Sequence, residues 1–201
     1  MHALPPKTWT PQSESQHCTL VPVKTGSSEW AEVESQLVAT MPKARLKQLE
    51  RIQCHNVHLW EYNCFRQALM TNRAGGKDPN VVSVWHGTKV NDPKLIYEDL
   101  QDGFMMQHSA AGMWGRGIYF AENASYSNNY AHTIAGSGQR CFLLAKLIVG
   151  EAKDLPSDGS LQMPPTKPGG GGRTTPSWGT RAGAESTSSF TRTAGLTRNI
   201  W

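Results

Sequence analysis

Apolar positions in the first quarter of the chain predict a strand followed by a helix. The run HCTLVPV at residues 17–23 is typical of a short strand, and Pro22 places it near a sheet edge because proline cannot donate a ladder hydrogen bond. Ser28 is expected to cap a helix whose first turn contains Glu29 and Glu32. One face of that helix carries the apolar stripe Trp30, Val33, Leu37, Val38 and Met41.

The next fifty residues have a less decisive pattern. Apolar residues recur every third position over residues 45–53, which by itself favours a helix. Another helix is predicted after Asn56, and its apolar face carries Leu59, Tyr62, Phe65 and Leu69. Residues 71–80 contain adjacent glycines and an Asp-Pro pair, so a loop is expected there.

Strands dominate the second half of the pattern. Apolar runs at residues 81–87 and 117–121 predict two strands. The run at 141–149 is so uniformly apolar that a strand covered on both faces is expected.

Short helices and one long loop are predicted between these strands. Asp92 and Pro93 favour a helix start, with the helix running through Leu100, and a second helix is predicted over residues 123–131. Residues 103–115 are rich in Met, His and Gly and predict a loop. The pattern as a whole indicates an α+β fold.

Size and composition allow one domain with a buried core. The chain has 201 residues, 38% of them hydrophobic, which is short for two domains. It contains no run of about 20 apolar residues, and its first twelve residues lack the features of a secretory signal. We therefore expect an intracellular protein of the nucleus or cytoplasm, without a membrane partner. A reduced, metal-free state is also expected, because four cysteines are scattered without a metal or disulfide pattern: Cys18, Cys54, Cys64 and Cys141.

The excess positive charge lies in the C-terminal tail. Of the formal net charge of +4, residues 1–166 contribute zero and residues 167–201 contribute all of it. A neutral body does not support binding to nucleic acid. The tail is rich in Pro, Gly, Ser and Thr, so we expect a folded domain at 1–166 and a disordered low-complexity tail at 167–201.

Single residues give weak evidence of chemistry. His86 ends an apolar strand, where a histidine is more often structural than catalytic. The GRG at residues 115–117 lacks the third glycine of a dinucleotide-binding turn. Tyr119, Tyr126 and Tyr130 are equally compatible with a place in the core. The order of these residues along the chain is more informative than any one of them.

The ordered set is specific: HGT at residues 86–88, WGRGIYFA at 114–121 and SYSNNYAH at 125–132. Over roughly residues 4–166 it resembles the catalytic domain of the poly(ADP-ribose) polymerase-like ADP-ribosyltransferases, and DGF at 102–104 fits the smaller, mostly mono-transferring members. The resemblance implies an α+β fold with a split antiparallel sheet and flanking helices. It also makes residues 45–53 a strand rather than a helix.

The resemblance implies an enzyme that uses NAD as co-substrate and no metal. It would transfer ADP-ribose to a protein or nucleic-acid acceptor, or to itself, and release nicotinamide. In the family, aromatic rings at the positions of Tyr119 and Tyr130 stack on the nicotinamide, and the residues at Gly87 and Ser127 hold its carboxamide. The residue at His86 hydrogen-bonds the ribose 2′-hydroxyl. Catalytic roles are therefore implied for His86 and Tyr119.

Two alternative functions stay open at this point. A catalytically degenerate module would bind NAD or ADP-ribose in the same pocket without transferring it. An RNA 2′-phosphotransferase uses a similar fold and NAD, but it needs a basic RNA-binding face, which the neutral body does not supply.

The tail lacks the C-terminal segments of the family. We therefore expect the last strands to be missing and the chain itself to be weakly active or inactive. In a shifted reading frame, the codons that overlap residues 174–179, 187–191 and 197–201 can encode three C-terminal segments of the family, in the order in which the family has them. This suggests an out-of-frame translation of an ordinary transferase C-terminus, with the shift near residues 169–172. A genuine disordered tail is the alternative.

Overall fold

The computed structural model describes residues 7, 9–13, 15–16, 18–54, 81–98, 104, 109, 111–148, 152–153, 156–161, 175–176 and 187–190. Its helices and small, mostly antiparallel sheets form the mixed α+β fold that the sequence predicted. The helix predicted after Asn56, the loop at 71–80 and part of the 103–115 loop lie outside the described residues.

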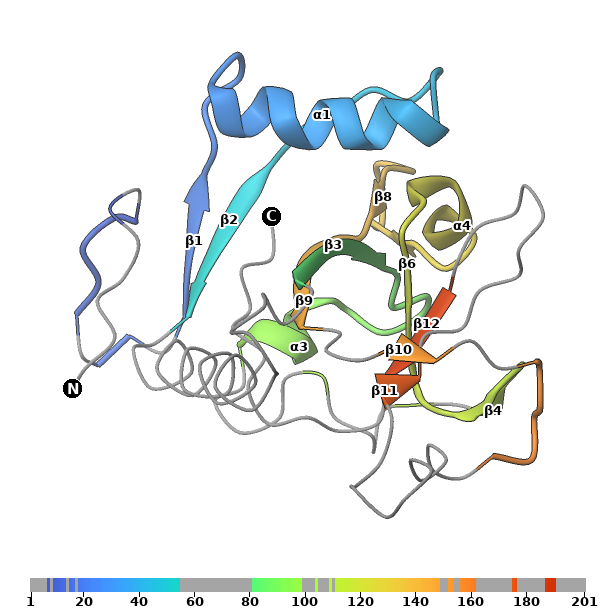
Figure 1. Ribbon diagram of the computed structural model, residues 1–201. Helices are drawn as coiled ribbons and strands as arrows, with labels where there is room; N and C mark the ends of the chain where they lie inside the picture. The colour runs from blue at the N-terminus through green and yellow to red at the C-terminus, as the bar shows by residue number, and fades with distance from the viewer. Residues whose placement is uncertain are drawn as a thin grey trace, which may run out of the picture.

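The first elements are two paired strands connected by the longest described helix. β1 (Cys18–Pro22) and β2 (Glu50–Cys54) are antiparallel, with Cys18 opposite Cys54. α1 (Ser28–Thr40) connects them and lies along one side of the fold (Figure 1). Within the described part of the chain β1 pairs with β2 alone, which is the edge position predicted from its proline.

A four-stranded antiparallel sheet forms the centre, in the order β12-β6-β3-β9. Its strands are β3 (Val81–His86), β6 (Ile118–Ala121), β9 (Leu143–Ile148) and β12 (Thr187–Phe190). β3 and β9 pair along their whole length, from Val81 opposite Ile148 to His86 opposite Leu143. The strands predicted at 81–87, 117–121 and 141–149 are confirmed, the last with a break at Phe142.

Short elements complete the described fold. The helices are α3 (Lys94–Tyr97) and α4 (Ala124–Asn128), both shorter than predicted. The paired short strands are β4 (Ala111–Gly112) with β5 (Gly115–Arg116), β7 (His132–Thr133) with β8 (Arg140–Cys141), and β10 (Ala152–Lys153) with β11 (Thr175–Pro176).

Apolar side chains cover both faces of the central sheet. Alternate residues of a strand point to opposite faces. On β9, Leu143, Ala145 and Leu147 enter one core, together with Val84 of β3, whereas Leu144 enters a second core. The second core also contains Trp30, Val33 and Leu37 of α1. The expectation of a strand covered on both faces at 141–149 is thus confirmed.

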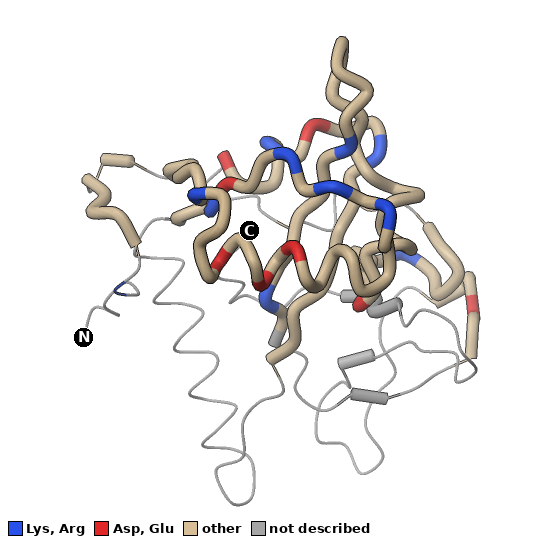
Figure 2. Tube along the Cα trace, turned by 90° about the horizontal axis from the view of Figure 1, so that it is seen from above, with Lys and Arg blue, Asp and Glu red and all other residues tan. Residues whose placement is uncertain are grey.

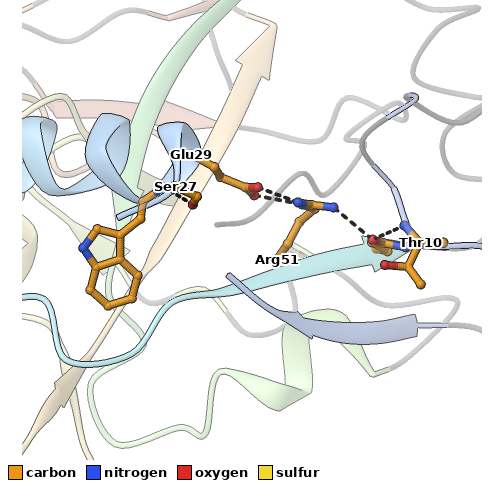
Figure 3. Close-up of polar contacts among 6 residues, drawn as sticks. Thr10, Ser27, Glu29 and Arg51 are labelled. Atoms are coloured by element: carbon orange, nitrogen blue, oxygen red, sulfur yellow. Dashed lines mark hydrogen bonds and ion pairs between the residues drawn. The ribbon is translucent and has the colours of Figure 1, made fainter. Parts of the chain in front are cut away.

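The start of α1 is fixed by a cap and an ion pair. The cap is Ser27, not Ser28 as predicted, because the Ser27 hydroxyl accepts the Trp30 backbone N–H at 3.2 Å. In the first turn, Glu29 accepts two hydrogen bonds from the Arg51 guanidinium on β2 (Figure 3). A further nitrogen of Arg51 donates to the buried side chain of Gln53 at 3.3 Å. This network ties α1 to β2.

The helical periodicity at 45–53 was misleading, as the family resemblance indicated. Residues 44–49 have no helix, and Glu50–Cys54 form β2. Leu49 and Ile52 lie three residues apart, an odd spacing that places them on opposite faces of an extended chain, and each enters a different core. Pairing with β1 therefore overrides the local pattern.

The C-terminal stretch contains two described strands, β11 and β12, where the sequence predicted no last strands. The disordered tail at residues 167–201 stays a prediction. β12 pairs with β6, with Thr187 opposite Ala121 and Phe190 opposite Ile118. Strand pairing uses backbone N–H and C=O groups, so a Ser/Thr-rich segment can occupy a sheet edge that its composition did not predict.

Charges of both signs are interspersed along the described trace (Figure 2). This agrees with the zero charge sum of residues 1–166. Within the described ranges, no helix has the length and apolar character needed to cross a bilayer.

Candidate functional site

One cavity of about 400 Å³ opens beside the central sheet, a volume within the usual range for small-molecule sites. Its walls come from the end of β3, from β6, from α4 and from the segments that follow β3 and α4. All five residues predicted from the sequence line it: His86, Gly87, Tyr119, Ser127 and Tyr130. The fold therefore brings together residues that are up to 44 positions apart in the chain.

His86 is held in one tautomer by the neighbouring strand. Its Nδ1 lies 2.8 Å from the backbone oxygen of Tyr119. A carbonyl oxygen can only accept, so Nδ1 carries the hydrogen and Nε2 of the neutral ring is left as an acceptor. Burial lowers the pKa of His86 below its ordinary value, although the bond to Tyr119 opposes this effect. The ring is therefore neutral at physiological pH.

Two phenylalanines fix the plane of the His86 ring. Phe104 meets it edge-on, with centroids 5.1 Å apart, and Phe120 lies tilted at 5.2 Å. The two phenylalanine rings also contact each other at 5.0 Å. Edge-to-face contacts of this kind stabilise aromatic pairs beyond their buried area. Sequence reasoning missed this role for Phe104, whose only signal was its place in the DGF motif.

Gly87 is required by the close approach of another backbone segment. A Cβ at this position would overlap the carbonyl group of Tyr130 and lie 2.9 Å from the Ala131 nitrogen. The Tyr130 oxygen also accepts the Lys89 backbone N–H at 2.7 Å. The end of β3 is thereby tied to the segment that follows α4.

The Tyr119 hydroxyl, on β6, is fixed by backbone groups of the preceding β4–β5 hairpin. It donates to the Gly115 oxygen at 2.5 Å and accepts from the Trp114 nitrogen at 3.2 Å. Burial raises the pKa of Tyr119, an effect that backbone hydrogen bonds partly offset. A Cβ on Gly112 would lie 2.7 Å from the tyrosine ring, so the ring packs directly on the β4 backbone.

Ser127 and Tyr130 differ in exposure. Ser127 is 3% exposed, and its hydroxyl donates to the Trp85 oxygen at 3.0 Å, which leaves oxygen lone pairs to accept a further bond. Tyr130 is 41% exposed at the cavity, and its ring lies 5.7 Å from that of Tyr126. Ser127 thus contributes a buried, hydrogen-bonded hydroxyl to the cavity wall, and Tyr130 contributes an accessible aromatic ring.

The charged lining residues were missed by sequence reasoning. The described residues of the cavity wall include one lysine, Lys89, and one aspartate, Asp92. Nothing in the sequence pattern distinguished them from other surface residues. The described ranges contain no group of three or more His, Cys, Asp and Glu placed to hold a metal ion.

Comparisons with known proteins agree with the geometry. The family model of the poly(ADP-ribose) polymerase catalytic domain matches residues 27–183. A probable poly [ADP-ribose] polymerase of Dictyostelium discoideum is 35% identical over 82% of this chain and 51% of its own length. The protein mono-ADP-ribosyltransferase PARP11 of Homo sapiens is 26% identical over 75% of this chain and 48% of its own length. PARP12 of Mus musculus, another protein mono-ADP-ribosyltransferase, is 28% identical over 74% of this chain and 20% of its own length. The chain spans about half the length of the first two relatives.

Proposed function

Because this chain belongs to the poly(ADP-ribose) polymerase catalytic domain family, we propose that it transfers ADP-ribose from NAD to a protein acceptor and releases nicotinamide. The names of PARP11 and PARP12 support transfer of a single ADP-ribose to each acceptor site. The observation that carries the proposal is the meeting of five residues, predicted from three separate motifs, in one cavity.

The nicotinamide end of NAD is proposed to lie between Tyr119 and Tyr130. Flat rings suit a flat pyridinium, and the electron-rich faces of tyrosine attract its positive charge. The backbone of Gly87 can approach the carboxamide because no side chain stands in the way. The hydroxyl of Ser127 supplies a further hydrogen bond to that carboxamide.

His86 is proposed to bind the ribose through Nε2, which accepts a hydrogen bond from the 2′-hydroxyl. Its neutral state matters for the reaction. As the bond between nicotinamide and ribose stretches, positive charge develops on the sugar, and a protonated imidazole beside it would oppose that charge. The burial that lowers the pKa of His86 removes this repulsion.

The transfer step needs no oxidant. A lone pair of the acceptor forms the new bond to the ribose C1′. The electrons of the broken carbon–nitrogen bond stay on nicotinamide, which leaves neutral, and the acceptor proton passes to water. The chain supplies position and a neutral imidazole beside the ribose rather than a covalent nucleophile.

Labelled NAD tests the proposal. The protein is incubated with NAD labelled in its adenylate phosphate, then denatured and separated, and the label that remains attached to protein is counted. Transfer predicts covalent label that depends on time and is lost in His86→Ala. Label that binds reversibly but never becomes covalent would instead support a degenerate NAD- or ADP-ribose-binding module.

A further inference from the structure

Lys89 adopts a backbone conformation that lysine rarely takes. Its φ of 57° is the one positive φ of a non-glycine residue in the described part of the chain. Two hydrogen bonds hold it there: its N–H donates to Tyr130 at 2.7 Å, and its carbonyl accepts from Nδ1 of His132 at 3.0 Å. A strained residue that its surroundings hold in place is a reason to look for a role.

The strained backbone directs the lysine side chain to the cavity. Nζ of Lys89 lies 5.6 Å from the centre of the Tyr130 ring, within the range of a cation–π contact. Both residues line the cavity. Lys89 is also the one cation among the described lining residues, where Asp92 is the one anion.

We propose that Lys89 is a specificity-determining residue that binds the pyrophosphate of the dinucleotide donor. This inference rests on the proposed function. A pyridinium and an ammonium group are both attracted to the face of Tyr130, and they repel each other at short range. Binding of the donor therefore displaces the ammonium group from the ring, and the two negative phosphates of the same donor give it a new partner.

Lysine suits such an exchange better than arginine. Its charge is compact and sits on a flexible four-carbon stem, so Nζ can move while the backbone stays fixed. The consequence is selection by charge. A ligand that contains the pyrophosphate gains an ion pair with Lys89, whereas neutral nicotinamide gains none and must share the Tyr130 ring with the resting ammonium group.

Binding calorimetry on the full chain tests this selection with ADP-ribose and nicotinamide as probes. Lys89→Met should weaken ADP-ribose binding about tenfold, the effect of losing one hydrogen bond to a charged group. Its nicotinamide binding should be unchanged or tighter. Lys94→Met is the matched control, since Lys94 is an exposed lysine on α3 that does not line the cavity. It should leave both ligands unaffected, and Lys89→Arg should keep most of the ADP-ribose affinity.

Salt gives a second readout. Affinity for ADP-ribose should fall with ionic strength in the unchanged protein and fall less in Lys89→Met, because salt screens the ion pair. Equal weakening of both probes in Lys89→Met would overturn the inference, as would unchanged ADP-ribose affinity. If the unchanged protein binds nicotinamide but not ADP-ribose, both the proposed function and this inference fail. If the unchanged protein binds ADP-ribose and Lys89→Met binds it equally well, only the inference about Lys89 fails.

Discussion

The carbonyl group of Tyr130 occupies the space into which a side chain on Gly87 would extend. The same oxygen accepts the Lys89 N–H, so the contact joins the end of β3 to the segment after α4 through backbone groups alone. This contact helps to position two walls of the cavity.

Gly87→Ala should therefore separate the walls and abolish ligand binding. The added methyl group forces a backbone shift, and overpacking of this kind costs about 1–3 kcal/mol of stability. Thermal unfolding and nicotinamide titration would measure both effects. Gly159→Ala is the control, because a Cβ there meets its nearest neighbour at an ordinary 3.6 Å. Unchanged nicotinamide affinity in Gly87→Ala would contradict the proposed carboxamide contact.

His86 should make the folded protein less stable in mild acid. Burial lowers its pKa in the folded state below the ordinary 6.5, whereas the unfolded chain binds the proton normally. Below about pH 6.5 the unfolded state therefore binds more protons, and stability falls as pH falls through this window. Unfolding midpoints measured from pH 8 to pH 5 should drop less in His86→Gln than in the unchanged protein. Parallel curves for the two proteins would count against a buried neutral imidazole.

The Arg51–Glu29 pair should stabilise the packing of α1 on β2. The two side chains are 11% and 16% exposed, so removing one leaves the other partly buried without its ionic partner. Arg51→Met should lower the free energy of unfolding by about 1.5–3 kcal/mol in urea titrations. Arg45→Met is the matched control, because Arg45 is exposed and its side chain contacts the adjacent Ala44 carbonyl. A loss below about 0.5 kcal/mol in Arg51→Met would show that this pair is no better than a surface ion pair.

The sequence singled out residues that line the cavity more readily than it predicted the supporting structure. His86, Tyr119 and Ser127 belong to short ordered motifs, and the resemblance of these motifs to a known family singled them out. Phe104 and Lys89 become informative only through contacts with residues that are distant in sequence. Neither hydrophobic periodicity nor amino-acid composition predicts such contacts.

The strands also divide into those that the sequence pattern predicted and those that it did not. β3 and β9 were predictable because uniformly apolar runs favour buried strands. β2 was not, since its periodicity favoured a helix until the family resemblance corrected it. β12 could not be foreseen, because its Ser/Thr composition carries no hydrophobic signal and its place depends on backbone pairing with β6.

Two truncations test whether β12 protects the edge of β6. Removing residues 187–201 exposes unpaired backbone groups of β6, which favours edge-to-edge association. Light scattering should then detect aggregation at protein concentrations where the full chain stays dispersed. Removing residues 191–201 keeps β12 and is the control. Equal aggregation of both truncated proteins would mean that pairing with β12 does not determine solubility.

Two substitutions of Tyr119 can separate the stacking role of its ring from the structural role of its hydroxyl. Tyr119→Phe keeps the ring but leaves the Trp114 N–H and the Gly115 oxygen without that hydroxyl, which should cost about 1–3 kcal/mol of stability. Tyr119→Ala should cost more stability and also lose nicotinamide affinity, because the ring itself is absent. Tyr130→Phe is the matched control, since no hydrogen bond to its hydroxyl is seen within the described ranges, and it should leave the unfolding midpoint unchanged. Calorimetric titration with nicotinamide at a temperature where all variants are folded measures the ring effect apart from stability. If Tyr119→Phe binds nicotinamide as weakly as Tyr119→Ala, the hydroxyl network rather than the aromatic face holds the ligand, and the proposed stacking is wrong.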